Sequence, residues 1–423
     1  MDFASSLSRK FLCALSMLAA VPGWTAEPLT LAEAQRIAVG RSQLLAANEA
    51  ALSASLKMGD AAYPLPDPVL KVGVDNLPVN GADRFSLTRD FMTMRRIGIM
   101  QELPSAEKRK LRAQSVSAKA LKVQAEQQMT LASVQRATAA AWIDRYYALA
   151  LLRLIAEQLE EAKLQVQSAE AAYRGARGSQ ADVFAARSAL SALQDRLSQV
   201  ERQERNAALM LARWVGSDAD RPPGGEPPWQ TTYLEKALTM DHLRTHPDLA
   251  IAAAVIEGAE ADARLASANR QADWTVEASY SQRGPAFGNM ISIGVSVPLQ
   301  LDRANRQDQE LAAKLALVDE AKARYEDLLR SHEAEVRVML GDWQTGKERV
   351  ARYASELVPV AQQRVEAALA AYRGGKADLA SVLAARRDAI DVRAQALTLE
   401  METARQWAQL NFLAVTHDHQ EQP

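Results

Sequence analysis

The sequence predicts a mainly helical chain in which one unit, two short strands followed by a long helical hairpin, occurs twice. Three observations predict this fold class. Residues 105–174 contain neither proline nor glycine, and a motif near the end of that segment recurs 199 positions later. Four short segments also alternate apolar and polar residues with a period of two, which is typical of strands.

Residues 105–174 are rich in Ala, Leu, Gln, Glu, Lys and Arg, which favour helix. At about 1.5 Å per residue, such a helix is a rod of about 100 Å. Gly175 ends this helix, and residues 179–215 predict a second helix that ends at Gly216. The Pro- and Gly-rich residues 216–232 then predict a linker between two halves.

The second half repeats the first. Residues 171–187 and 370–386 are identical at ten of 17 positions, which is too many for alanine bias alone. A period near 200 residues indicates a duplicated domain rather than a solenoid. Both copies contain Tyr-Arg-Gly, and we expect Gly175 and Gly374 to supply the permissive backbone that reverses the chain at a hairpin tip.

The predicted strands are residues 69–75, 96–100, 274–280 and 291–297. An alternation of this kind fits a strand between lipid and a wet lumen, and it also fits a half-buried strand on a soluble core. Four strands cannot enclose a lumen, because small membrane barrels use about eight. Three chains would supply about twelve strands, so the count favours a transmembrane β-barrel shared by three copies.

Residues 1–26 have a basic start at Arg9 and Lys10, an apolar run and a small-residue end, which predict a secretory signal peptide cut after Ala26. The only cysteine, Cys13, lies inside this segment. We therefore expect a mature chain without disulfides or thiolate metal sites, and without an N-terminal lipid. The predicted division of the chain is 1–26 signal peptide, 27–215 first repeat, 216–232 linker, 233–415 second repeat and 416–423 polar tail.

Composition excludes several classes of function. The 50 basic and 52 acidic residues alternate along the helices, so no nucleic-acid partner is expected. With 24% charged and 48% hydrophobic residues, the chain is not intrinsically disordered. It has no G-x-S-x-G elbow, phosphate loop or dinucleotide fingerprint, so we expect no enzyme, no catalytic residues and no cofactor.

Metal-ligand candidates are few. His242 and His246 have helical i,i+4 spacing but no third ligand beside them, and His246 also begins a helix-start motif with the Pro and Asp that follow it. The thioethers of Met92, Met94 and Met100 could contact soft Cu(I) or Ag(I), but such methionines more often fill gaps in packing. We therefore expect no resident metal site.

Several motifs occur in a characteristic order: Leu31–Ala34, Ile97–Pro104, Tyr173–Gly175, His246–Leu249, Ile293–Leu299 and Tyr372–Gly374. In these motifs the mature chain resembles the TolC family of outer-membrane efflux channels over essentially its whole length. The residues Met92–Arg96 and the absent lipid cysteine most resemble the heavy-metal branch, which serves copper/silver or cobalt/zinc/cadmium exporters.

The resemblance implies a homotrimer with a 12-stranded barrel in the outer membrane and an α-helical, coiled-coil tube in the periplasm. The tube would dock at its tips onto a periplasmic adaptor (membrane fusion) protein and an inner-membrane resistance-nodulation-division pump. The chain would be a passive conduit for heavy-metal cations. Two alternatives remain open: the same channel exporting organic drugs or secreted proteins, and a soluble periplasmic adaptor-like coiled-coil protein.

The resemblance also places adaptor contact and gating at the hairpin tips. Members of the family narrow the pore with carboxylates just past the second-repeat turn, but the matching residues here are Ser381 and Ala384. Asp182 or Asp378 could form such a ring instead. The implied tip residues are Tyr173, Arg174, Gly175, Asp182, Arg187, Tyr372, Arg373, Gly374, Asp378 and Arg386.

Overall fold

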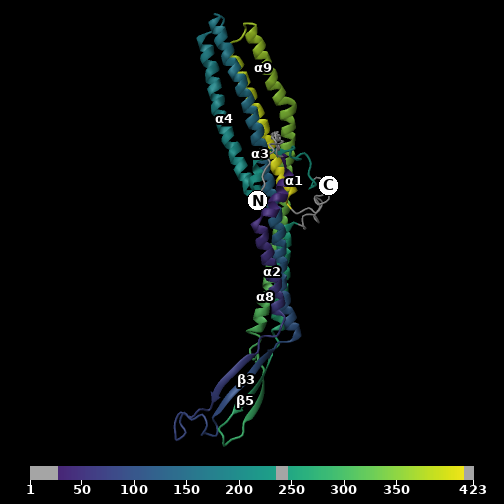
Figure 1. Cartoon of the computed structure of the whole chain (residues 1–423). Coiled ribbons are helices and arrows are strands. Elements are labelled where there is room, and N and C mark those ends of the chain that lie inside the picture. The colour runs from purple at the N-terminus through teal and green to yellow at the C-terminus, as the bar shows by residue number, and fades with distance from the viewer. Residues whose placement is uncertain (1–26, 235–245, 414–423) are drawn as a thin grey trace, which may run out of the picture.

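The chain forms a long rod of helices that ends in a small sheet (Figure 1). This computed structural model describes residues 27–234 and 246–413. The predicted signal peptide and the predicted polar tail lie outside the described residues.

Each half contains the expected two strands followed by a helical hairpin, and in both halves helices that the expected unit did not include precede these strands. The helices are α1 (Leu31–Arg41), α2 (Gln43–Ala62), α3 (Ala106–Arg174), α4 (Gln180–Val215), α7 (Pro247–Ala268), α8 (Gln307–Arg352), α9 (Val358–Arg373) and α10 (Leu379–Asn411). The strands are β1 (Leu29–Thr30), β2 (Val69–Asp75), β3 (Met94–Leu103), β4 (Pro223–Gly224), β5 (Trp274–Gln282) and β6 (Met290–Ser296). None of the described helices combines the length and apolarity needed to cross a membrane.

The predicted long helix is confirmed. α3 has 69 residues and begins where the Ser105 hydroxyl accepts the amide of Lys108 (3.2 Å). Its counterpart in the second repeat is α8 followed by α9, joined by the π-helical turn Tyr353–Leu357. Pro359 lies in the first turn of α9, where a missing amide donor is tolerated. The second repeat therefore has a wider helical turn where α3 continues without a break.

The largest apolar core lies midway along the rod, where α1, α3, α4, α8 and α10 meet. Two buried tryptophans tie the connecting segments to the long helices. The indole of Trp142 on α3 donates to the carbonyl of Leu29 (2.8 Å), and that of Trp343 on α8 donates to the carbonyl of Trp229 (2.9 Å). Trp343 and Trp229 lie about one repeat length after Trp142 and Leu29, respectively. The duplication of the chain therefore accounts for both of these core contacts.

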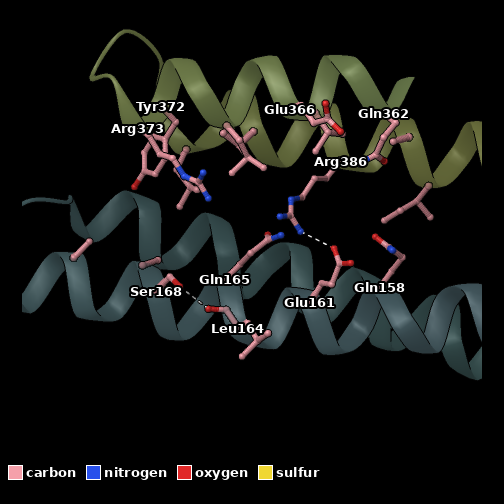
Figure 2. Close-up of a pocket in the computed structure, with 18 of the residues that line it drawn as sticks. Gln158, Glu161, Leu164, Gln165, Ser168, Gln362, Glu366, Tyr372, Arg373 and Arg386 are labelled. Carbon is pink, nitrogen blue, oxygen red and sulfur yellow. Dashed lines mark hydrogen bonds and ion pairs between the residues drawn. The ribbon is translucent and has the colours of Figure 1, made fainter. Parts of the chain in front are cut away.

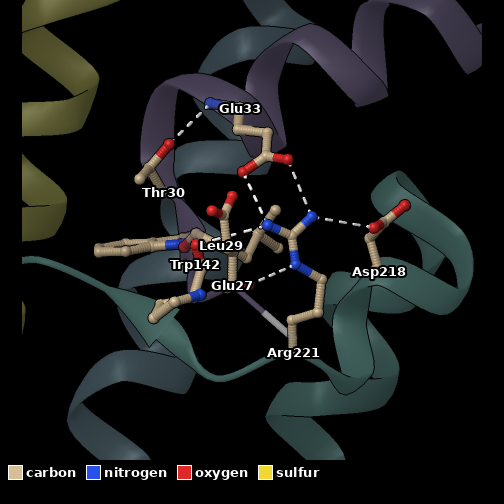
Figure 3. Close-up of polar contacts among 8 residues, drawn as sticks. Glu27, Leu29, Thr30, Glu33, Trp142, Asp218 and Arg221 are labelled. Carbon is tan, nitrogen blue, oxygen red and sulfur yellow. Dashed lines mark hydrogen bonds and ion pairs between the residues drawn. The ribbon is translucent and has the colours of Figure 1, made fainter. Parts of the chain in front are cut away.

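Arg221 anchors the segment that precedes α1 (Figure 3). Its guanidinium donates to both carboxylate oxygens of Glu33 (2.8 and 3.0 Å), to Asp218 (3.1 Å) and to the carbonyl of Glu27 (2.7 Å). The hydrogen bond from Arg221 lowers the pKa of Glu33. Together with the parallel pairing of β1 and β4, these bonds join the first described residues to the segment after α4.

The four-stranded sheet has the order β2-β3-β5-β6, and every neighbouring pair is antiparallel. All four predicted strands are confirmed, and β3 extends beyond the predicted residues 96–100 at both ends. Side chains in register lie on one face of the sheet. Two rows define its apolar face: Leu70–Ile99–Ala278–Ile293 and Val72–Ile97–Tyr280–Ile291.

A buried ion pair joins the sheet to the helices. The ammonium of Lys108, near the start of α3, donates to the carboxylate of Asp273 (2.8 Å) and to the carbonyl of Gln271. Lys108 is only 3% exposed. Since Asp273 directly precedes β5, this pair links the strand–helix junction of the first repeat to the incoming strand of the second.

His246 and His332 form a buried pair between the start of α7 and the middle of α8. Their ring centroids are 3.9 Å apart, and both Nε2 atoms are buried without a hydrogen-bond partner. His246 caps α7, because its Nδ1 accepts the amide of Asp248 (3.3 Å). Burial, helped by His332 and Arg136, lowers the pKa of His246 to about 4, and burial also lowers the pKa of His332.

Stability should therefore fall on mild acidification. An unfolded histidine has a pKa near 6.5, so between pH 7 and 5 the unfolded chain binds protons that folded His246 does not bind. We expect a loss of roughly 2 kcal/mol over that range. His332→Gln removes one titrating ring and its repulsion, and should reduce the loss. Denaturant unfolding followed by circular dichroism at both pH values measures the difference. Equal losses in both proteins would contradict this interpretation.

Candidate functional site

The implied tip residues gather at two turns at the end of the rod opposite the sheet, one between α3 and α4 and one between α9 and α10 (Figure 1). The amide of Gly175 donates to the carbonyl of Ala171, and the amide of Gly374 donates to that of Ala370, both at 3.0 Å. Two further backbone bonds recur with the same offset: Ala176–Tyr173 with Gly375–Tyr372, and Arg177–Ala172 with Lys376–Ala371. The repeated sequence thus gives a repeated turn.

The expectation that Gly175 and Gly374 supply the permissive backbone of the two turns is wrong. Their φ angles are −84° and −81°, which any residue can adopt. The left-handed position is one residue later, at Ala176 (φ 54°) and Gly375 (φ 68°). The reason is that the last helical hydrogen bonds still include the first glycine, so the chain leaves the helix only at the next residue. The first repeat therefore places an alanine where glycine is favoured.

Asp182 and Asp378 both cap helices. At α4, the Ser179 hydroxyl accepts the amide of Asp182 (3.1 Å), while the Asp182 carboxylate accepts the amide of Ser179 (2.8 Å). At α10, the Asp378 carboxylate accepts the amide of Ser381 (2.8 Å) and its hydroxyl (2.5 Å). Serine and aspartate have exchanged places between the repeats. The hydrogen bonds from Ser381 lower the pKa of Asp378, so this carboxylate is ionised at neutral pH.

The equivalent arginines Arg187 and Arg386 have different partners. Arg187 on α4 pairs with Glu170 on α3, within its own hairpin (2.7 Å). Arg386 on α10 pairs with Glu161 on α3 (2.8 Å), and so connects the second hairpin to the first. The residue equivalent to Glu170 in the second repeat is Leu369, which offers no charge. Arg386 is therefore left to bind across the hairpins.

A groove of about 660 Å³ lies between α3 and the second hairpin (Figure 2). Arg386 and Glu161 meet across it, and the Gln165 amide oxygen, oriented toward Arg386, accepts from its Nε (2.9 Å). Tyr372 and Arg373 line the groove near the turn. The other implied tip residues, Tyr173 and Arg174, are exposed at the first turn.

The second face of the sheet is polar and is crossed by ion pairs. Lys71 on β2 pairs with Glu277 on β5 (2.6 Å), and Arg96 on β3 pairs with Asp75 on β2 (3.1 Å). Arg96 also lies 3.9 Å from Glu277. Several side chains on this face are small, and four are larger and apolar. The small ones are Gly73, Gly98, Ser279, Ser281 and Ser292, and the larger ones are Val69, Met94, Met100 and Met290.

No described part of the chain covers the apolar face. Ile291 and Ile293 are each 77% exposed, and Val72 is 74% exposed. The outer strands β2 and β6 each pair on one side only in the described structure, so both present unpaired backbone groups. An exposed apolar surface of this kind marks a site of interaction with lipid or with protein.

The metal-ligand candidates do not converge. Met94 and Met100 share the polar face, but they are six residues, about 20 Å, apart on β3. His242 lies outside the described residues. Within residues 27–234 and 246–413, no three His, Cys, Asp or Glu side chains are arranged to hold a metal ion. The pairing of His246 with His332 has no sequence signal, since the two are 86 positions apart.

The backbone geometry predicts opposite effects at equivalent positions of the two turns. Ala176→Gly should stabilise the chain by about 1 kcal/mol by relieving the left-handed strain, and Gly375→Ala should destabilise it by a similar amount. Gly374→Ala, at an ordinary φ, is the matched control and should have a smaller effect. Thermal unfolding of the three variants measures this. A Gly374→Ala variant less stable than Gly375→Ala would contradict the assignment of the left-handed position.

Comparison with known proteins identifies the fold. Residues 238–414 match the family model described as outer membrane efflux protein. The outer-membrane channel OprN matches with a TM-score of 0.72 and 18% identity, over 90% of this chain and 89% of that one. The outer membrane protein VceC of Vibrio cholerae matches with a TM-score of 0.73 and 19% identity, over 90% and 95%.

CusC, whose structures concern folding and transmembrane channel formation, matches with a TM-score of 0.75 and 15% identity, over 91% of this chain and 92% of that one. No curated protein matches the sequence. The chain thus has the fold of these channel structures along most of its length, and residues 238–414 are similar to the outer membrane efflux protein model.

Proposed function

We propose that the chain is the outer-membrane channel of a tripartite efflux system and acts as a passive conduit. The observation that carries this proposal is the sheet, with one exposed apolar face, one charged face and two open edges. A surface of this kind is suited to lipid on one side and to a water-filled lumen on the other.

Three copies would close the barrel. β2 leads away from the helices and β6 leads back toward them, so β6 of one copy lies antiparallel to β2 of the next. Three sheets of four strands give twelve, and closure pairs every edge group, which the interior of a bilayer demands. The apolar rows then form the outer wall and the ion pairs line the lumen.

The helices would form the periplasmic tube. α3 alone spans about 100 Å, and the tips lie at the end remote from the sheet (Figure 1). In this arrangement the tip turns and the groove beside Arg386 face an adaptor protein and, beyond it, an inner-membrane pump of the resistance-nodulation-division class. The predicted signal peptide would direct the chain to this compartment, without lipidation.

The cargo we propose is heavy-metal cations. Met94 and Met100 support this, because their thioethers share the polar face and are soft contacts for Cu(I) and Ag(I) in transit. A deletion strain that becomes sensitive to copper, silver, cobalt, zinc or cadmium salts supports metal cargo. Sensitivity to organic drugs alone would favour the drug-exporting alternative.

Adjacent residues on opposite faces of β6 test the channel itself. Ile293→Lys places a charge on the lipid side and should destabilise the inserted protein by about 2–4 kcal/mol. Ser292→Lys places the same charge on the lumen side and is the matched control. We expect only the control to yield trimers in the outer-membrane fraction, measured by membrane flotation and electron microscopy of purified particles. A soluble wild-type monomer would contradict the channel.

The arginine pair at the tips tests gating. In our proposal the Arg386–Glu161 contact holds the second hairpin against the first and keeps the entrance narrow. Arg386→Gln should raise the single-channel conductance in planar bilayers several-fold. Arg187→Gln, which breaks only a contact within one hairpin, should leave it near the wild-type value. Equal conductance in the two variants would exclude a specific role of Arg386.

A further inference from the structure

A polar pair interrupts the apolar face of the sheet at one end. Arg95 on β3 lies opposite Val74 on β2 and Gln282 on β5, so its register places it on the same face as Ile97 and Ile99. Because β3 runs from this row toward the start of α3, the row lies at the distal end of the sheet, the end farthest from the helices (Figure 1). A guanidinium and a carboxamide therefore stand side by side beside rows of aliphatic side chains.

Arg95 forms no ion pair with the described residues, in contrast to its neighbour. Arg96, on the polar face, pairs with Asp75 and approaches Glu277. Within residues 27–234 and 246–413, the only hydrogen bond of the Arg95 side chain is from Nη2 to the carbonyl of Arg283, at 3.5 Å, and its Nε is buried without an acceptor. Among the described residues no carboxylate neutralises Arg95, and the Nη end of its guanidinium is the part left for a group from outside the chain.

The acidic residues at the distal end are already engaged. Asp75 pairs with Arg96 (3.1 Å), Asp83 pairs with Arg89 (3.5 Å), and Asp90 accepts the backbone amide of Met92 (2.8 Å). The side chain of Gln282 forms no hydrogen bond to the described part of the chain. By contrast, Gln101, on the same face at the helical end, donates to the carbonyl of Pro66 (2.7 Å). Arg95 and Gln282 therefore both have donors without acceptors.

We propose that Arg95 and Gln282 bind a phosphate group of a lipid in the outer leaflet of the outer membrane. This inference rests on the proposed function, which puts the apolar face in lipid and the distal end at the outer surface. The planar guanidinium matches phosphate oxygens with two parallel hydrogen bonds, and the amide adds a third donor. The ligand is a phosphorylated glycolipid headgroup, and the trimer would carry three such sites.

The site also explains why a charge is present on this face. At the level of the headgroups a cation attracts anionic lipid, whereas the same side chain at the middle of the bilayer would be strongly unfavourable. The aliphatic rows next to Arg95 contact acyl chains while the guanidinium extends toward the headgroup. One residue thereby fixes how deep the sheet lies in the membrane.

Lipid binding to the purified full-length trimer tests the proposal. Native mass spectrometry counts the lipid A molecules bound per trimer as lipid A is titrated. We expect Arg95→Gln to weaken binding about fivefold, because it removes one cation at the headgroup level. Gln282→Leu should weaken binding less, and Arg95→Lys should restore part of it. Arg89→Gln, the same charge change in the neighbouring loop, is the matched control and should bind like the wild type.

Three further results would overturn the proposal. The first is equal binding of lipid A and dephosphorylated lipid A to the wild type, a comparison that needs no variant. The second is full displacement of lipid A by millimolar inorganic phosphate, which would show a site for free anions. The third is an equal loss of binding in Arg95→Gln and Arg89→Gln. Failure of the wild type to assemble as an outer-membrane trimer would instead refute the proposed function, and this inference with it.

Discussion

A four-stranded antiparallel sheet cannot cover its own apolar face or pair its own edges, and the rest of this molecule is consistent with that constraint. Hydrophobic side chains such as Ile291 are exposed in the single chain. None of the described helices can bury them, because the sheet lies beyond the end of the helical rod (Figure 1). An exposed apolar face with unpaired edges marks a site of interaction with lipid or with protein. The buried Lys108–Asp273 pair then orients the sheet relative to the helices.

The two repeats share some tertiary contacts and differ in others. Trp142 and Trp343 repeat one tertiary contact faithfully, because both close the same thick core in the middle of the rod. Away from that core the two repeats differ. The helix α3 is continuous, whereas the second repeat has a π-helical turn at the equivalent place. Arg386 pairs with Glu161 of the other hairpin, whereas Arg187 pairs with Glu170 of its own hairpin. Wide helical turns often occur at functional sites. The second hairpin therefore has both an irregular helix at its base and a polar tie near its tip.

Much of the fold could be predicted from the sequence, since the relevant signals are local. Residues 105–174 lack helix breakers, and the alternation in 69–75 and 291–297 follows directly from the pleat of a strand. Tertiary contacts could not be predicted in this way. Glu161 and Glu170 lie on the same helix, and only the crossing of the hairpins decides which one binds Arg386. The left-handed residue lies one position after the first glycine of each turn, because the end of a helix depends on its last hydrogen bonds and not on the first glycine.

Negative charge at the tips is tied to folding. Asp182 and Asp378 occupy different positions in their turns, yet each accepts an amide at the start of its helix and each is bonded to a serine. One carboxylate per turn is therefore retained even though serine and aspartate have exchanged places. A carboxylate at the start of a helix is stabilised by the helix dipole, and each turn also carries two basic side chains, Arg174 and Arg177 in the first and Arg373 and Lys376 in the second. The two carboxylates therefore lie among basic neighbours, and the role that the structure gives them is to begin α4 and α10.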